Sequence, residues 1–262
     1  RDLFYKTRVS LGLNDFDFKH ILKADETFVA PMVYCGYSMN GFGEMSRQMN
    51  RFAINNVLPK QLNDKILPVL YNSWEATEFD VNCEHQTALA ELAGEMGVEL
   101  FVMDDGWFGK RNDDRSSLGD WYVNENKLKG GLASLIERVN ALGLKFGIWF
   151  EPEMVNPGTE LYKNHPDWIL HTKGRKPSQA RNQLTLDYSR DDVCDYIIDT
   201  LSGILSRANI EYIKWDMNRA MSEPGSAFWD GAHQGEVMHR YILGLYRVLE
   251  TLTQRFPNVL FE

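Results

Sequence analysis

A chain of 262 residues, 44% of them hydrophobic, is long enough to bury a large core, and it fits either one α/β barrel or two smaller domains. Its formal net charge of −9 argues against a nucleic-acid or anionic-membrane partner, because both need a basic surface. Aromatic residues make up 12% of the chain, and their flat rings suit stacking on the C–H face of a neutral sugar.

The cysteines and histidines limit which cellular compartment and which cofactors are expected. Cys35, Cys83 and Cys194 form no CxxC pair, and an odd number cannot form a closed set of disulfides. We therefore expect a reducing compartment and a cytoplasmic protein. The six histidines include no HExxH motif and no zinc-ligand spacing, so we expect neither a metal nor a cofactor. No apolar run is long enough to span a bilayer, which predicts no membrane partner.

Residues 1–60 differ in pattern from the rest of the chain. Short apolar stretches alternate with turn residues, and Gly41 and Gly43 are expected to delay any helix until Met45. We predict that residues 1–60 are the end of a β-rich N-terminal domain and a linking segment. The predicted helix ends near Asn56.

From residue 61 onward, short apolar strands alternate with helical patterns. The predicted strands are 66–71, 100–103, 145–150, 184–186, 210–215 and 259–261. The predicted helices are 83–96, 132–142, 191–208 and 233–255. Strand and helix units joined by short loops predict a parallel sheet.

The strand ends distinguish a barrel from a doubly wound sheet. Ligands of a doubly wound sheet collect at one switch point, whereas here every predicted strand ends in acidic or aromatic residues. These are Trp74, Asp104, Asp105, Glu151, Asp187, Asp216 and Glu262. No Gly-rich phosphate loop follows the first strand. The predicted fold class is therefore α/β, with residues 61–262 forming the first six or so strands of a (β/α)8 TIM barrel.

The strand at 210–215 runs into a cluster of polar residues. Because the C-terminal ends of barrel strands converge on one pocket, Asp216 is the candidate nucleophile. We expect Lys214 to lower the pKa of Asp216 and keep it ionised. The alternative is a structural salt bridge between Lys214 and Asp216 at the strand end.

Many carboxylates together with Trp, Lys and Arg suit the cleavage of a glycosidic bond. In that reaction one carboxylate attacks the anomeric carbon and a second protonates the leaving oxygen. Asp104 and Asp105 are adjacent acids that would accept hydrogen bonds from neighbouring sugar hydroxyls. An Asx turn or helix N-cap leading into Gly106 is the structural alternative for the same pair.

Four motifs follow one another along the chain: DDGWF at 104–108, GDW at 119–121, GIWFEPEM at 147–154 and KWDMNR at 214–219. In order and spacing, this set resembles the α-galactosidases of glycoside hydrolase family 36, over nearly the whole chain. The resemblance implies a (β/α)8 barrel, with residues 1–60 at its junction with an N-terminal β-supersandwich. It also implies a homo-oligomer, a tetramer, for the full-length protein.

The resemblance also implies residue roles around the sugar. Asp216 would be the nucleophile that forms a covalent galactosyl-enzyme intermediate, and Lys214 beside it would bond sugar hydroxyls. Asp104 and Asp105 would bind the 4- and 6-hydroxyls, which selects galactose because its 4-hydroxyl is axial.

The same resemblance assigns the remaining candidates. Trp74 and Trp149 would wall the subsite, with core packing at the barrel rim as the alternative for each. Arg181 would reach the same ring, or else form a salt bridge on its loop. Asn218 would bind the 2-hydroxyl.

The implied activity is hydrolysis of terminal non-reducing α-D-galactosyl residues, in melibiose and raffinose-type oligosaccharides, by a retaining double displacement. Members of the family carry the acid/base Asp after a Gly-rich run that follows the sixth strand, so we expect it beyond Glu262. Three alternatives stay open. They are galactosyl transfer of the raffinose or stachyose synthase kind, α-N-acetylgalactosaminidase activity, and a galactose-binding remnant that lacks the acid.

Overall fold

The computed structural model describes residues 8–62 and 65–262. The chain divides into two compact units. The smaller unit comprises Arg1–Asp17 and Ile21–Leu67, and the larger comprises Phe18–His20 and Pro68–Glu262. The assignment of the first unit to the end of a β-rich domain stays a prediction.

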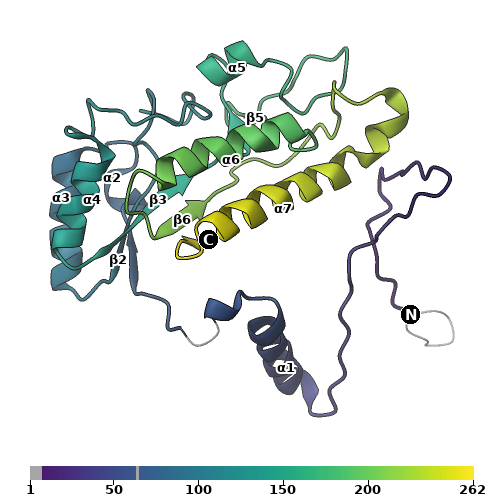
Figure 1. Ribbon diagram of the computed structural model, residues 1–262, viewed down its shortest axis with the longest axis horizontal. Helices are drawn as coiled ribbons and strands as arrows, with labels where there is room; N and C mark the ends of the chain where they lie inside the picture. Colours follow the sequence, from purple (N-terminus) through teal and green to yellow (C-terminus); the bar gives the residue numbers. More distant parts are fainter. Residues whose placement is uncertain (1–7, 63–64) are drawn as a thin grey trace. The chain divides into compact units, whose positions relative to one another are not determined.

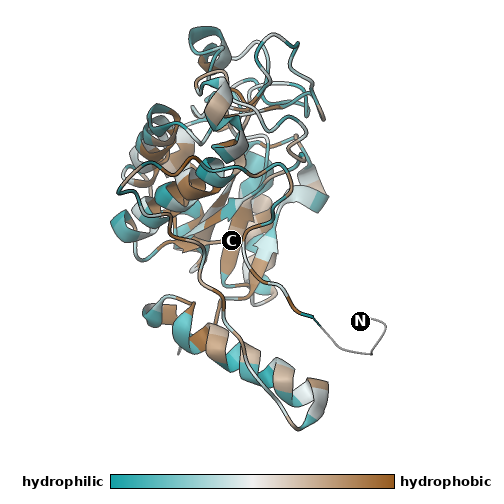
Figure 2. Cartoon of the chain, turned by 90° about the vertical axis from the view of Figure 1, so that its right-hand side faces the viewer, coloured by the Kyte–Doolittle hydropathy of each residue, from teal (hydrophilic) through white to brown (hydrophobic). Residues whose placement is uncertain are grey.

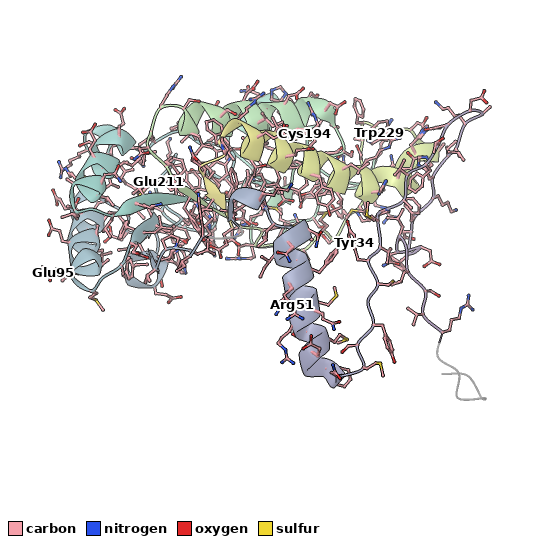
Figure 3. The ribbon with its side chains drawn as sticks, turned by 60° about the horizontal axis from the view of Figure 1, so that its bottom comes forward. Tyr34, Arg51, Glu95, Cys194, Glu211 and Trp229 are labelled. Atoms are coloured by element: carbon pink, nitrogen blue, oxygen red, sulfur yellow. The ribbon has the colours of Figure 1, made fainter. Side chains whose placement is uncertain are left out.

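Helix α1 (Gly41–Asn56) is the main regular element of the first unit, and it is followed by the 3-10 turn η1 (Lys60–Leu62). It begins at Gly41, so the predicted start at Met45 was wrong. The cost of glycine is entropic and is greatest in the middle of a helix, so Gly41 and Gly43 are tolerated in its first turn. On its exposed surface Glu44 pairs with Arg47 and with Arg51, which Figure 3 labels.

The second unit is built on one parallel sheet with the strand order β1-β2-β3-β6-β7 (Figure 1). The strands are β1 (Leu70–Asn72), β2 (Leu100–Met103), β3 (Lys145–Phe150), β6 (Tyr212–Trp215) and β7 (Leu260–Phe261). Every neighbouring pair in this sheet is parallel. The predicted α/β fold class is confirmed as part of a (β/α) barrel, and the five described strands do not close into a ring.

The segment at 184–186 is not a strand of this sheet, so the prediction of six sheet strands was wrong. Instead, β5 (Leu184–Thr185) pairs antiparallel with β4 (Met154–Val155), and β6 lies directly beside β3. The run Leu184-Thr185-Leu186 is short and would be buried in either arrangement, so its pattern cannot distinguish the two. Asp187 therefore follows this small ribbon and does not end a barrel strand.

The helices alternate with the sheet strands as predicted. They are α2 (Trp74–Thr77), α3 (Cys83–Glu95), α4 (Gly131–Ala141), α5 (Glu160–Asn164), α6 (Asp191–Leu205) and α7 (Val237–Arg255). The 3-10 turn η2 (Gly231–Glu236) precedes α7, so the last helix begins later than His233. No helix within residues 8–62 and 65–262 is long and apolar enough to cross a membrane.

The core lies between the strands and the inner faces of the helices. Figure 2 shows the strands of the sheet largely in brown, the colour of hydrophobic residues. At the centre of the sheet Gly147 leaves room for its neighbours, because a Cβ there would lie 2.9 Å from Val102 and 3.0 Å from Tyr212. This close fit aligns β2, β3 and β6, whose C-terminal ends carry the predicted site.

Helices α6 and α7 run side by side (Figure 1) and approach each other closely at Gly244. A Cβ at Gly244 would collide with the carbonyl of Tyr188 and lie 3.0 Å from Sγ of Cys194, which Figure 3 labels on α6. Cys194 is buried with a free thiol, and burial raises its pKa to about 11. A reactive thiolate is therefore not expected here.

Candidate active site

Asp216 lies just past the end of β6 and is only partly buried. Its backbone N–H donates to the carbonyl oxygen of Phe150 on β3, at 2.8 Å. Its Oδ2 accepts hydrogen bonds from Nε1 of Trp149, at 3.1 Å, and from Nδ2 of Asn218, at 2.8 Å. Its Oδ1 accepts the N–H of Met217 at 3.0 Å. Two adjacent strands and the turn after β6 therefore fix the orientation of this carboxylate.

Lys214 forms its ion pair with Asp104, with Nζ 2.8 Å from Oδ2, so the alternative of a structural salt bridge between Lys214 and Asp216 was wrong. The Asp104 side chain is 4% exposed, and Nδ2 of Asn72 donates to the same oxygen at 2.6 Å. Lys214 is level with Trp149 on β3, and Asp104 directly follows β2 on the other side of β3. The lysine therefore reaches across the central strand to the acid.

Asp105 is bound by the buried guanidinium of Arg111. Nε of Arg111 lies 3.0 Å from Oδ1, and one terminal nitrogen lies 2.8 Å from Oδ2. Burial raises the pKa of Asp105, and the charge and hydrogen bonds of Arg111 oppose that rise. The N–H of Asp105 also donates to Oδ1 of Asp104, which is one residue away and not the two residues of an Asx turn. The prediction missed Arg111, whose sequence signal is a cation in the same loop as the paired acids.

The two predicted tryptophans differ in exposure. Trp74 is partly exposed at the start of α2, where its ring contacts Phe79 edge-on. Trp149 is 2% exposed, and its ring packs against those of Phe108 and Trp121. The Trp149 ring therefore belongs to the core, and only its indole N–H reaches the site, where it donates to Asp216.

Arg181 and Asn218 lie on the same side of the nucleophile. Arg181 is exposed, with a left-handed φ of 50°, and a terminal nitrogen donates to the carbonyl oxygen of Asn218 at 3.3 Å. The Asn218 side chain is already bonded to Asp216. The structure therefore brings Asp216, Trp149, Asn218 and Arg181 into one connected group. Lys214 lies two residues before Asp216 and forms an ion pair with Asp104, so Asp104 lies next to this group.

Glu151, at the end of β3, is a site residue that the prediction did not select. Its side chain is fully buried, and Oε1 accepts the backbone N–H of Asn218 at 2.6 Å. Oε2 accepts a hydrogen bond from Nε2 of Gln183 at 3.3 Å. Burial raises the pKa of Glu151 to about 7, with a smaller rise from the charge of Asp216, while bonds from Asn218 oppose it. The sequence signal was an acid at a strand end that also forms part of a family motif.

Two further buried acids hold the loops around this site. Glu153 accepts hydrogen bonds from the indole of Trp215, at 2.9 Å, and from the hydroxyl of Tyr241 on α7. Asp187 accepts the hydroxyls of Ser189 and Ser226. Burial raises the pKa of both acids. In the part of the chain that the structure describes, no three His, Cys, Asp or Glu side chains are grouped as a metal site.

Two cavities, of about 310 Å³ and 200 Å³, lie away from these residues. They adjoin the loop at 110–122 and the helix α5, and both are lined by Asp120, Tyr122 and Glu160. Neither is lined by a predicted site residue, so the candidate active site is the group at the strand ends.

The family model described as Melibiase matches residues 27–262. The chain belongs to the melibiase family. It is 52% identical over 261 residues to the α-galactosidase AgaA of Geobacillus stearothermophilus, covering 100% of this chain and 36% of that protein. The crystal structure of AgaA, a glycoside hydrolase family 36 enzyme, covers 95% of this chain and 35% of its own, with a TM-score of 0.90. A variant of AgaA in complex with raffinose is 51% identical, with the same coverage and TM-score.

These matches confirm the resemblance to family 36 that the four motifs suggested. An α-galactosidase of Lactobacillus acidophilus is also 44% identical over 262 residues, again covering 36% of that protein. This melibiase chain spans about a third of the length of the relatives it matches. The activity of the whole protein is therefore argued below as a proposal.

Proposed function

We propose that this chain forms part of the catalytic barrel of an α-galactosidase that hydrolyses terminal non-reducing α-D-galactosyl residues. One observation carries the proposal. Asp216 stands partly exposed at the C-terminal end of β6, with one carboxylate oxygen held by Trp149 and Asn218. Relatives of the chain are named α-galactosidases, and family-36 structures are described in complex with raffinose and stachyose.

The residues suit a retaining double displacement. An oxygen of Asp216 attacks the anomeric carbon, the bond to the leaving oxygen breaks, and an acid protonates that oxygen. Water then attacks the same carbon, the ester bond to Asp216 breaks, and the acid, now a base, takes the proton of the water. The hydrogen bonds from Trp149 and Asn218 hold the carboxylate before attack, which lowers the orientational cost of the first step.

The ion pair of Lys214 and Asp104 supplies charged groups for sugar hydroxyls. Charge-assisted hydrogen bonds are stronger than neutral ones, and an ammonium donates while a carboxylate accepts. Side by side, the two groups can bind neighbouring hydroxyls of one ring. We propose that Asp104 and Asp105 bind the 4- and 6-hydroxyls of galactose and that Lys214 binds further hydroxyls. Trp74 would wall the subsite, and Arg181 would reach the same ring.

The acid is a separate requirement. Glu151 is a carboxyl near Asp216, and the charge of Asp216 helps to raise its pKa, but it is fully buried and enclosed by Asn218 and Gln183. It cannot reach a leaving oxygen without rearrangement. We propose that an Asp outside residues 1–262 is the acid/base, and that the full-length protein is a cytoplasmic homo-oligomer.

The test is an assay of the full-length protein on an aryl α-galactoside, the matching α-glucoside and the N-acetylgalactosaminide. We expect turnover of the galactoside at least 100-fold faster than of the other two, with α-galactose as the first product. Hydrolysis of raffinose in water, without build-up of longer oligosaccharides when sucrose is added, excludes a synthase. Galactose binding without any turnover would overturn the proposal in favour of a binding remnant.

A further inference from the structure

The end of β3 binds the turn after β6 at two alternate residues. The N–H of Asp216 donates to the carbonyl oxygen of Phe150 at 2.8 Å, and the N–H of Asn218 donates to Oε1 of Glu151 at 2.6 Å. In a parallel ladder, the N–H groups of alternate residues on one strand bind the carbonyls of alternate residues on the next. The side chain of Glu151 therefore takes the acceptor position that the main chain of β3 would fill at the next step.

Asn218 connects this acceptor to the nucleophile. Its backbone N–H is bound by Glu151, and its side-chain Nδ2 donates to Oδ2 of Asp216 at 2.8 Å. Once the backbone of Asn218 is fixed, its short side chain has few rotamers left for reaching Asp216. The orientation of the Asp216 carboxylate thus depends on a buried acid that has no exposed surface of its own.

We propose that Glu151 is a positioning residue for the nucleophile Asp216, and that it acts by binding the backbone N–H of Asn218. This inference rests on the proposed function, because it assigns Glu151 a part in the same reaction. Glu151 is not a catalytic residue, since it touches neither the substrate nor the reacting atoms.

The surroundings of Glu151 favour the protonated form below about pH 7. The charged groups that face it are Asp216, at the end of β6, and Arg111, in the loop after β2. Burial and the negative charge of Asp216 raise the pKa of Glu151 to about 7, while Arg111 and the bonds from Asn218 lower it. The buried Oε1 of Gln183 has no hydrogen-bond partner among the described residues, and a protonated Glu151 donates to it once that amide turns over.

Ionisation of Glu151 would disturb the nucleophile. An ionised Glu151 accepts the backbone N–H of Asn218 more strongly and adds a like charge near Asp216, so it shifts the turn that holds the nucleophile. As the pH rises through 7, the hold on Asp216 weakens and the rate falls. Glu151→Gln removes this change, because the amide keeps the size of the side chain and an acceptor oxygen for the N–H of Asn218, and it does not titrate.

The experiment compares Glu151→Gln with the wild type in the full-length protein, using an aryl α-galactoside from pH 5 to 9. The ratio of kcat/KM for the variant to that for the wild type cancels every titrating group that both proteins share. We expect the ratio to be within about threefold of one below pH 6 and to rise about tenfold between pH 6 and 8.5. In Glu151→Leu, which has no acceptor, kcat should fall about 30-fold or more while KM changes less than threefold.

The matched control is Glu153→Gln. Glu153 is equally buried two residues further on, but it bonds Trp215 and Tyr241 and not Asn218, so its ratio should be flat with pH. A flat ratio for Glu151→Gln would overturn the inference, whether or not Glu151→Leu folds. A loss of more than 100-fold in Glu151→Gln at pH 5.5 would also overturn it, because an ionised or proton-donating Glu151 would then be required. An inactive wild type would instead refute the proposed function, and this inference with it.

Discussion

Lys214 and Asp104 form an ion pair that is almost fully buried on its acidic side. Asn72 completes the surroundings of the carboxylate with a third polar group. A pair of this kind contributes little net stability while both partners are present, but removal of one partner leaves an uncompensated buried charge. This asymmetry allows the structural role of the pair to be separated from its role in binding sugar.

Lys214→Met in the full-length protein should lower the free energy of unfolding by about 2 kcal/mol. Breaking a fully buried pair costs roughly 3–5 kcal/mol, and the lysine side chain here is 30% exposed, which reduces the cost. Adding Asp104→Asn should restore most of the stability, because it removes the negative charge that is left buried without its partner Lys214. The kcat/KM for galactosides should stay about 100-fold low in the double variant, since each lost bond between a charged group and a hydroxyl costs about 1.5–3 kcal/mol. Urea unfolding and initial rates measure the two effects, and a fully active double variant would show that the pair is only structural.

The partner of Lys214 shows where prediction from sequence ends for the site. The positions of Asp104, Lys214 and Asp216 at strand ends follow from the alternation of strands and helices, and the structure places all three there. Which charges meet depends on strand order, because β3 separates the strands that carry Asp104 and Lys214. The partners of buried side chains such as Asp105 and Glu151 depend on loop paths that no local pattern specifies.

At the scale of elements, the sequence predicted most of the fold because short apolar strands alternate along the chain with segments that have apolar residues at helical spacing. The prediction for 184–186 failed because a short, strand-like run fits both the main sheet and a small two-stranded ribbon. The predicted start of α1 at Met45 was wrong because glycine disfavours the interior of a helix more than its first turn. Contacts between elements, such as that of α6 with α7, could not be predicted, because no pattern within either segment indicates its partner.

Gly244→Ala and Gly203→Ala should change stability in opposite directions. A Cβ at Gly244 on α7 meets the backbone of Tyr188, so we expect a loss of about 1–3 kcal/mol from overpacking. A Cβ at Gly203 on α6 meets nothing within 4 Å, so alanine there should add up to about 1 kcal/mol through its higher helix propensity. Thermal and urea unfolding of both variants measure the difference. Equal effects at the two positions would show that α6 and α7 are not in close contact at Gly244.

The whole molecule carries several acids whose pKa burial raises. They are Asp105, Asp120, Glu151, Glu153 and Asp187. Between the ordinary pKa of such an acid and its raised value, the folded state binds more protons than the unfolded state does. Stability from these groups is therefore present at low pH and lost as the pH rises. A net charge of −9 acts in the same direction, because self-repulsion disfavours the compact state.

The free energy of unfolding should therefore be highest near pH 5 and fall towards pH 8. Glu151 alone, with a pKa of about 7 against an ordinary 4.5, accounts for roughly 3 kcal/mol of that fall. Glu151→Gln should flatten the profile by about this amount, and urea unfolding at a series of pH values measures it. A stability that rises from pH 5 to 8, or a variant profile parallel to that of the wild type, would show that Glu151 is ionised throughout this range.

The identity of the nucleophile is tested most directly by trapping the covalent intermediate. The full-length protein is incubated with a slowly released fluorinated α-galactoside, digested, and its peptides are weighed and fragmented by mass spectrometry. We predict one added galactosyl mass on the peptide that contains Asp216, localised to that residue, and none in Asp216→Asn, which should also lose nearly all turnover. A label on another carboxyl, or an Asp216→Asn enzyme of near-normal activity, would contradict the assignment.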